Sequence, residues 1–279
     1  SSMDIYENLY IVTTMADMDE IEDKYKALAR KVRNQFPRVN ILNALPLIIE
    51  LRVHKQAEEI EEVKTSIRYT KEALEFVMKN LKPGMYEYEV RANYEYQLML
   101  RNSGPSFATI AASGKNAVIL HYIELQNKIN DGDLILCDLG ALSNMYASDI
   151  TRTYPANGKF TQRQKDLYNI VLGAQDVVMD IIKPGILEKD VNDAVKNYFA
   201  KELKVIKLIS DDKDVAKYYY HGVGHPLGLD VHDLRCRDRK VAENNIYTVE
   251  PGLYIAEEGI GIRIEDDILV TKDGNVNLS

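Results

Sequence analysis

The stretch DLILCDLGALSNMYASDITRTYP, residues 133–155, predicts an antiparallel hairpin. Residues 134–139 and 145–153 have strand character, and the polar pair Ser143-Asn144 between them predicts a turn. Asp138 and Asp149 lie symmetrically about that turn, so the hairpin would set them face to face, with Cβ atoms roughly 4.5–5.5 Å apart. Two like charges at that distance cost stability unless a cation lies between them. The stretch therefore points to a bound cation.

A second stretch, YTVEPGLYIAEEGIGIRIEDDI at residues 247–268, has the same construction. Glu250 and Glu265 lie symmetrically about a turn centred on Glu257-Glu258. Pro251 has no N–H to donate to a strand ladder, so this hairpin should be irregular or at an edge there. Four facing acids without a cation would destabilise one another, which makes a solvated surface role improbable for all four together.

Histidines accompany both hairpins and indicate which ion would bind. Four of the five in the chain, His121, His221, His225 and His232, fall in or near these stretches. An oxygen-rich ligand set with one or two imidazoles suits a divalent ion such as manganese, cobalt or zinc. Shared carboxylates favour two ions about 3.5–4 Å apart. The sequence therefore predicts a centre of two divalent metal ions, manganese before cobalt or zinc.

Composition excludes several other classes of protein. The chain has 279 residues, a formal net charge of −8 and no basic block, which argues against a nucleic-acid partner. Cys137 and Cys236 are too few for a disulfide framework and indicate a reducing, cytoplasmic compartment. No run of 18 apolar residues occurs, so we expect no membrane span. Residues 1–3, Ser-Ser-Met, are expected to be a vector remnant.

An internal repeat organises most of the chain. Residues 56–81 and 162–182 each predict an amphipathic helix, and each helix ends at Lys-Pro-Gly, residues 82–84 and 183–185. Another helical segment follows each stop, with Val90 and Val191 at equal distances from it, and then come a histidine and an acidic hairpin. This order predicts a pseudo-symmetric α/β domain over residues 54–279, with its site between the two halves.

Residues 1–53 lie outside the repeat and are too short for a robust domain. We expect a strand at residues 8–13, a charged helix at 18–35 and an apolar packing segment at 45–52. The segment is interpreted as the remnant of a truncated amino-terminal domain plus a linker.

Five motifs carry a family resemblance over about residues 50–279. They are ILHYIE (119–124), the run from DLG to SDITRTYPANGKFTQRQ (138–164), HGVGHPLGLDVHD (221–233), TVEPGLYI (248–255) and GIGIRIEDDILV (259–270). With these motifs the chain resembles the metallopeptidases of the pita-bread fold, most closely the aminopeptidase P group. The resemblance implies a pseudo-two-fold α/β (α+β) fold with a curved antiparallel sheet and outer helices.

The resemblance also implies a role for each site residue. Asp149 and Glu265 would bridge the two ions, Asp138 would complete one site, and His225 with Glu250 would complete the other. Further positions match residues at the substrate cleft, namely His121, His221, His232 and Arg263. A metal-bridged hydroxide would be the nucleophile. Glu250 would shuttle its proton, and His232 with His221 would hydrogen-bond the developing oxyanion.

The function implied is an exopeptidase that cuts the bond between an amino-terminal residue and a penultimate proline. Its partners would be peptides with proline in second position, and the family's longer amino-terminal domain suggests a homo-oligomer. A prolidase, which cuts only Xaa-Pro dipeptides, is the near alternative, and methionine aminopeptidase fits the motifs less well. A non-catalytic peptide-binding scaffold is the alternative of another class. Such scaffolds usually lose metal ligands, whereas all five positions are filled here.

Overall fold

The computed structural model describes residues 6–12, 24–236 and 238–279, and the chain divides into two compact units, residues 1–53 and 54–279. The predictions made for residues 1–3, 13 and 18–23 lie outside the described residues. Among the described helices, none has the length and apolar character that a membrane crossing requires.

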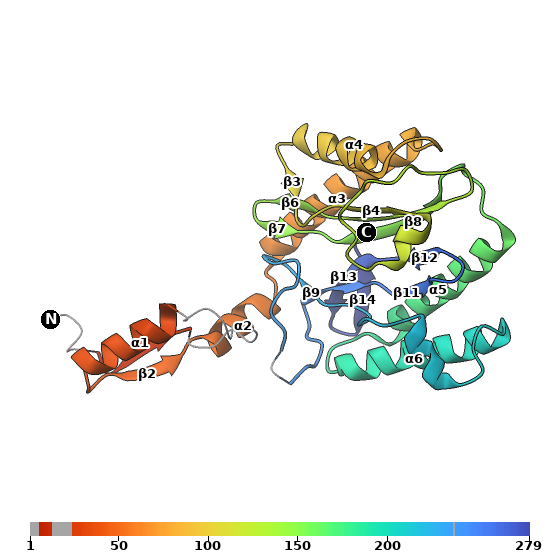
Figure 1. The fold of residues 1–279 in the computed structure, drawn as a ribbon. Helices are drawn as coiled ribbons and strands as arrows, with labels where there is room; N and C mark the ends of the chain where they lie inside the picture. The colour runs from red at the N-terminus through yellow and green to blue at the C-terminus, as the bar shows by residue number, and fades with distance from the viewer. Residues whose placement is uncertain (1–5, 13–23, 237) are drawn as a thin grey trace. The chain divides into compact units, whose positions relative to one another are not determined.

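The described residues of the 1–53 unit form a small parallel pair of strands and two helices (Figure 1). Strand β1 (Asn8–Ile11) pairs in parallel with β2 (Asn40–Asn43), with Asn8 opposite Asn40. Helix α1 (Lys24–Gln35) lies between them in the chain, as a parallel crossover requires. The apolar segment predicted at residues 45–52 forms helix α2 (Leu45–Val53).

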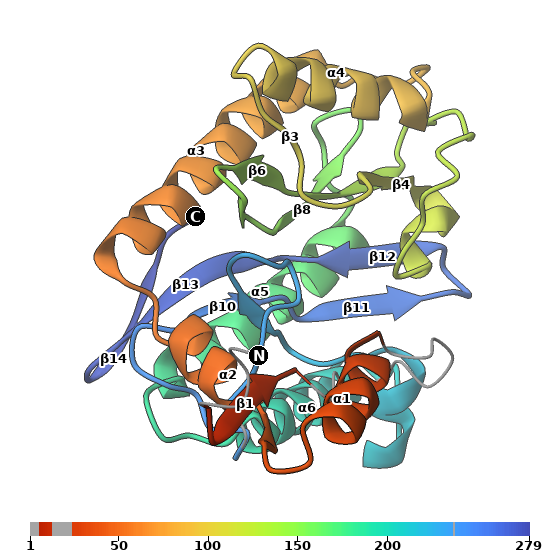
Figure 2. The same cartoon turned by 90° about the vertical axis from the view of Figure 1, so that its left-hand side faces the viewer.

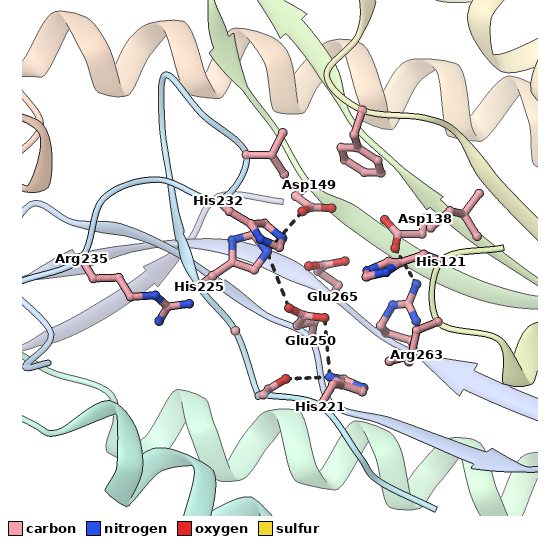
Figure 3. Close-up of a pocket in the computed structure, with 16 residues that line it drawn as sticks. His121, Asp138, Asp149, His221, His225, His232, Arg235, Glu250, Arg263 and Glu265 are labelled. Carbon is pink, nitrogen blue, oxygen red and sulfur yellow. Dashed lines mark hydrogen bonds and ion pairs between the residues drawn. The ribbon is translucent and has the colours of Figure 1, made fainter. Parts of the chain in front are cut away.

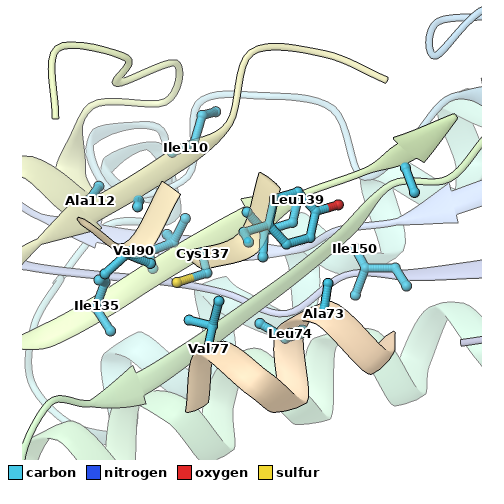
Figure 4. Packing of buried hydrophobic residues seen from close by; sticks show 14 of the residues in the cluster. Ala73, Leu74, Val77, Val90, Ile110, Ala112, Ile135, Cys137, Leu139 and Ile150 are labelled. Atoms are coloured by element: carbon cyan, nitrogen blue, oxygen red, sulfur yellow. The ribbon is translucent and has the colours of Figure 1, made fainter. Parts of the chain in front are cut away.

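The first half of the 54–279 unit packs two helices on short antiparallel strands. Helices α3 (Ala57–Asn80) and α4 (Glu87–Met99) cover a sheet of order β4-β5-β8 (Figure 2). The strands are β3 (Gly104–Pro105), β4 (Ile110–Ser113), β5 (Leu134–Leu139), β6 (Ala141–Ser143), β7 (Tyr146–Ala147) and β8 (Ile150–Pro155), and a 3-10 helix η2 (Gly114–Val118) follows β4. Cys137 of β5 faces the core with Val77 of α3 and Val90 of α4 (Figure 4), so its neighbour Asp138 points away from that core.

The second half repeats the helix pair on a second group of strands. Helices α5 (Gln162–Ile181) and α6 (Glu188–Val205) are followed by the 3-10 helix η3 (Asp212–Lys217). The strands are β9 (Pro226–Leu227), β10 (Ile246–Val249), β11 (Gly252–Ile255), β12 (Ile260–Arg263), β13 (Asp266–Thr271) and β14 (Gly274–Asn277). They form a sheet of order β14-β13-β10-β9 and a separate β11-β12 hairpin. Strand β12 lies beside β5 and β8, so the two groups of strands meet in the middle of the unit.

The repeat predicted from the two Lys-Pro-Gly stops is confirmed. Gly84 and Gly185 both have positive φ, 99° and 89°, which is a conformation that glycine adopts without steric cost. The N–H of Gly84 donates to the carbonyl of Ile129 at 2.8 Å, and the N–H of Gly185 donates to that of Val241 at 2.8 Å. Each half therefore leaves its first helix through the same turn.

The register predicted for the first hairpin is wrong by two residues. Asp138 lies opposite Thr151. Asp149 comes just before β8 in the sequence and lies diagonally across from Asp138. The turn is made by Asn144 and Met145, which both have positive φ, 46° and 72°, as a two-residue hairpin turn of the I′ type requires. Because the shift is an even number of residues, both acids keep the same face of the hairpin.

The register predicted for the second hairpin is confirmed. Gly252 lies opposite Arg263 and Val249 opposite Asp266, so Glu250 and Glu265 face each other where the ladder breaks. Pro251 lies in this break, as expected. The N–H of Glu250 donates instead to Val223 O at 2.8 Å, and that of Glu265 donates to Thr151 O at 3.0 Å.

Candidate metal centre

A cavity of about 440 Å³ lies between the two halves of the 54–279 unit (Figure 3). Both halves contribute to its wall, and every site residue predicted from the sequence lines it. The lining residues are Phe107, Ile110, Leu120, His121, Asp138, Asp149, His221, Gly222, Gly224, His225, Val231, His232, Arg235, Glu250, Arg263 and Glu265. The structure therefore brings the predicted residues together, while their individual roles stay predictions.

Three of the five predicted metal ligands form a close group. Asp149, His225 and Glu265 each offer one ligand atom, and these atoms lie within 4.8 Å of one another. All three side chains are buried. Asp138 and Glu250 line the same cavity outside this group of three. Glu250 nevertheless lies close to the group, with its Oε1 3.6 Å from His225 Nε2.

His225 is held with one ring nitrogen facing the acids. Its Nδ1 lies 3.1 Å from the carbonyl oxygen of Pro226, and a carbonyl can only accept, so Nδ1 carries the proton of this hydrogen bond. Nε2 then keeps its lone pair and lies 3.5 Å from Asp149 Oδ2. Burial lowers the pKa of His225 to about 3. This is the neutral tautomer that a metal ligand needs, oriented by its second nitrogen.

The carboxylates of the cavity are crowded and buried. Burial first, and then the charges of neighbouring acids, raise the pKa of Asp149 and of Glu265 well above the usual range. Burial raises the pKa of Glu250 to about 8. Among the described residues, Asp138 Oδ1, Asp149 Oδ1 and Glu265 Oε1 are buried oxygens with no hydrogen-bond partner. Unpartnered buried acceptors around one point fit a divalent cation, which would supply the missing positive charge.

Arg263 holds one of these acids in place. Its Nη2 donates to Asp138 Oδ2 at 2.5 Å, and its Nη1 donates to Tyr254 Oη at 2.9 Å. Its Nε donates to Thr151 Oγ1 at 3.2 Å. The side chain is buried, so Arg263 is not a surface residue of its strand. One Asp138 oxygen is thereby fixed while the other stays unpartnered.

Sequence reasoning missed three residues that shape the centre. Thr151 Oγ1 donates to Glu265 Oε2 at 2.6 Å, and the N–H of Asp149 donates to Asp267 Oδ2 at 3.0 Å. The guanidinium of Arg235 lines the cavity. Thr151 had a usable signal, since it lies two residues after Asp149 and so on the same face of the strand. The other two carried no signal in the sequence, because their contacts depend on packing between segments far apart in the chain.

The three histidines predicted at the cleft surround the metal group (Figure 3). The His232 ring lies 4.0 Å from that of His225, measured between centroids. His221 Nε2 lies 2.9 Å from Tyr254 Oη, and its Nδ1 lies 3.8 Å from Glu250 Oε2. His121 is exposed at the cavity wall. Hydrogen-bonding imidazoles therefore stand beside the cluster of acids.

Comparison with known proteins shows which family the chain resembles. The sequence matches metallopeptidase family M24 over residues 61–272. It is 38% identical over 254 residues to the Xaa-Pro aminopeptidase of Escherichia coli, which covers 84% of this chain and 58% of that protein. It is 34% identical over 238 residues to the Xaa-Pro dipeptidase of Pyrococcus horikoshii, covering 84% of this chain and 64% of that protein. The chain thus spans about three fifths of the length of these curated relatives.

Solved structures agree as well. A Bacillus anthracis protein assigned as an aminopeptidase P superposes with a TM-score of 0.94 at 48% identity, covering 98% of this chain and 66% of that one. Aminopeptidase P from E. coli with the inhibitor Pro-Leu gives a TM-score of 0.86 at 33% identity, covering 98% and 67%. The predicted pita-bread fold, a mixed α/β fold with antiparallel sheets, is confirmed. The chain belongs to metallopeptidase family M24.

Proposed function

We propose that the chain is a metal-dependent exopeptidase that hydrolyses the bond between an amino-terminal residue and a penultimate proline. The observation that carries the proposal is the group of Asp149, His225 and Glu265 in a cavity that also holds three imidazoles. The names of the relatives, which are Xaa-Pro aminopeptidases and Xaa-Pro dipeptidases, support the same bond.

Two divalent ions, manganese before cobalt or zinc, would be held by the five predicted ligands. Asp149 and Glu265 would lie between the ions, Asp138 would complete one site, and His225 with Glu250 would complete the other. The unpartnered oxygens of Asp138, Asp149 and Glu265 support this assignment, since each is buried and free to bind. When bound, the ions supply Lewis acidity and lower the pKa of water towards neutrality.

Glu250 is the proton shuttle of the proposal. It lies at the edge of the group, 19% exposed, within reach of His225 on one side and His221 on the other. A proton taken from the attacking water must reach the proline nitrogen, because a tertiary amide nitrogen needs a proton to leave. His232, with His221 as the second candidate, would donate a hydrogen bond to the oxyanion that develops on the scissile carbonyl.

The wall of the cavity suits proline. Apolar side chains, Phe107, Leu120 and Val231, line it beside the histidines. The ring of proline fixes its φ, so a shaped apolar surface can recognise it without a hydrogen bond from its nitrogen. The E. coli aminopeptidase P structure holds the inhibitor Pro-Leu, which supports recognition of proline by a protein of this fold. A cytoplasmic location, a homo-oligomer and the origin of residues 1–53 in a longer domain stay predictions.

A prolidase is the second candidate, favoured by the similarity to the P. horikoshii Xaa-Pro dipeptidase. The deciding experiment is hydrolysis of Xaa-Pro, Xaa-Pro-Yaa and Xaa-Pro-Yaa-Zaa by protein loaded with manganese, cobalt or zinc. The proposal expects cleavage of the longer peptides. Cleavage of the dipeptide alone would establish a prolidase. A protein that takes up no metal and cuts nothing would be a peptide-binding scaffold.

A further inference from the structure

Glu87, the first residue of α4, is a fully buried carboxylate outside the metal group. Its five hydrogen-bond donors are all neutral groups. Oε1 accepts from Ser113 N and Oγ, both at 2.8 Å, and from Asn116 Nδ2 at 2.9 Å. Oε2 accepts from Tyr122 Oη at 2.8 Å and from Asn127 N at 3.0 Å. Both oxygens of this buried carboxylate accept hydrogen bonds. These hydrogen bonds offset the free-energy cost of removing the carboxylate from water.

All of these donors belong to one segment, residues 113–127, which we call the cleft loop. The cleft loop carries His121 and Leu120 in the cavity wall, and residues 119–127 belong to no helix or strand. Asn116 and Tyr122 lie on either side of His121 in the sequence. The carboxylate is therefore hydrogen-bonded to the cleft loop both before and after this histidine. An irregular segment with few backbone bonds of its own is ordered by such a contact.

The second half has a glutamate at the same position of the repeat. Glu188 is the first residue of α6 and stands three residues after Gly185, as Glu87 stands three after Gly84. Its Oε2 accepts from Arg235 Nη1 at 2.5 Å, and Arg235 lines the cavity. Figure 3 places His121 and Arg235 on opposite sides of the metal group. Glu87 thus contacts the cleft loop that carries His121, and Glu188 contacts Arg235 on the opposite side of the metal group.

We propose that Glu87 is a positioning residue for substrate recognition: it fixes the cleft loop and, through it, His121, as Glu188 fixes Arg235 across the cleft. This inference rests on the proposed function, because it assigns recognition of the peptide to that cleft. None of the hydrogen bonds of Glu87 involves a predicted metal ligand, so its effect should fall on substrate binding rather than on metal content.

The test is Glu87→Gln in the metal-loaded protein. A glutamine amide keeps the size of the side chain but has one acceptor oxygen, and its NH₂ group would face donors such as the N–H of Asn127. We expect KM for Xaa-Pro-Yaa-Zaa to rise about tenfold while kcat and bound metal stay within about twofold. Amide exchange in residues 116–127 should speed up. Glu89→Gln is the matched control, because Glu89 lies on the same helix and accepts from Tyr86 N, which a glutamine oxygen can also do.

Tyr122→Phe provides a gentler second variant, since it removes one donor to Glu87 and leaves the carboxylate in place. We expect a smaller rise in KM, about twofold to threefold, again without loss of kcat. The inference is overturned if both variants lower the melting temperature but leave KM unchanged, or if kcat and metal content fall when KM rises. If the wild-type protein cuts no proline-second peptide, the proposed function fails instead. The rate of amide hydrogen exchange in the cleft loop, compared between Glu87→Gln and Glu89→Gln, then decides whether Glu87 orders this loop.

Discussion

The first half of the 54–279 unit contributes only carboxylates to the predicted ligand set, Asp138 and Asp149, whereas the second half adds the imidazole of His225 to its two glutamates. The close group needs both halves, since Asp149 comes from the first and His225 and Glu265 from the second. Either half alone would present an incomplete site. The two halves of the repeat thus contribute different side chains, and the packing between them forms the candidate metal centre.

The halves also differ in the contacts of Asp138 and Glu250, the two predicted ligands outside the close group. Asp138 is paired with the buried guanidinium of Arg263. Glu250, in contrast, lies between His225 and His221, at 3.6 and 3.8 Å. The acid from the first half is therefore fixed by a permanent cation, and the acid from the second half is left free to exchange a proton. The following predictions test this division.

The largest effect is expected for Glu250→Gln. Turnover of Xaa-Pro-Yaa-Zaa should fall about 10²–10⁴-fold, because a glutamine amide cannot carry the proton to the leaving nitrogen. The far-UV circular dichroism spectrum should be unchanged. Steady-state kinetics in a buffer of defined metal content measures the loss. Activity equal to that of the wild type would contradict the role given to Glu250.

Asp138→Asn should lower the stability of the protein even when no metal is bound. It leaves the Arg263 guanidinium buried without its carboxylate, and breaking a buried ion pair costs about 3–5 kcal/mol. Urea unfolding of the metal-free protein measures the free energy of unfolding. Glu250→Gln is the comparison, since no arginine or lysine of the described chain forms an ion pair with Glu250, and it should cost less than about 1 kcal/mol. Equal losses for the two variants would remove the distinction between the halves.

Removal of metal should loosen both halves together. Chelation with EDTA is expected to abolish activity and to lower the melting temperature, because a ligand that binds only the folded state stabilises it by about 3–4 kcal/mol at 100–1,000 times its Kd. Amide exchange should increase around β8 and around β12 alike, since the ligands come from both sides. Loosening confined to one half would show that the metal does not join them.

The smallest effect is expected for Glu188→Gln. Arg235 is 31% exposed and Glu188 14%, so water screens this pair, and its loss should cost about 1 kcal/mol and less at high salt. Glu87→Gln should cost more and show no salt dependence, because the carboxylate is fully buried and its donors are neutral. Thermal melts at low and high salt compare the two. Equal losses would mean that the two equivalent glutamates contribute the same stability, and a larger loss for Glu188→Gln would contradict the prediction.

Much of the site could be predicted from spacing in the sequence. The second hairpin folds in the expected register because Pro251 and the Glu257-Glu258 turn leave few alternatives. The register of the first hairpin differs from the predicted one because Met145 adopts positive φ. The residue type methionine does not predict this conformation. Contacts between the halves were beyond prediction for a further reason. Arg263 with Asp138, and Asp149 with Asp267, meet only after the two groups of strands have packed together.

The hydrogen bond from Thr151 to Glu265 joins residues 114 positions apart in the chain. Contacts of such sequence separation form late, since the chain between them must first give up its freedom. A nascent or half-folded chain would therefore hold its acids too far apart to capture an ion. Under the proposed function, metal uptake would therefore require both halves to have packed together, and partly folded copies would have no peptidase activity.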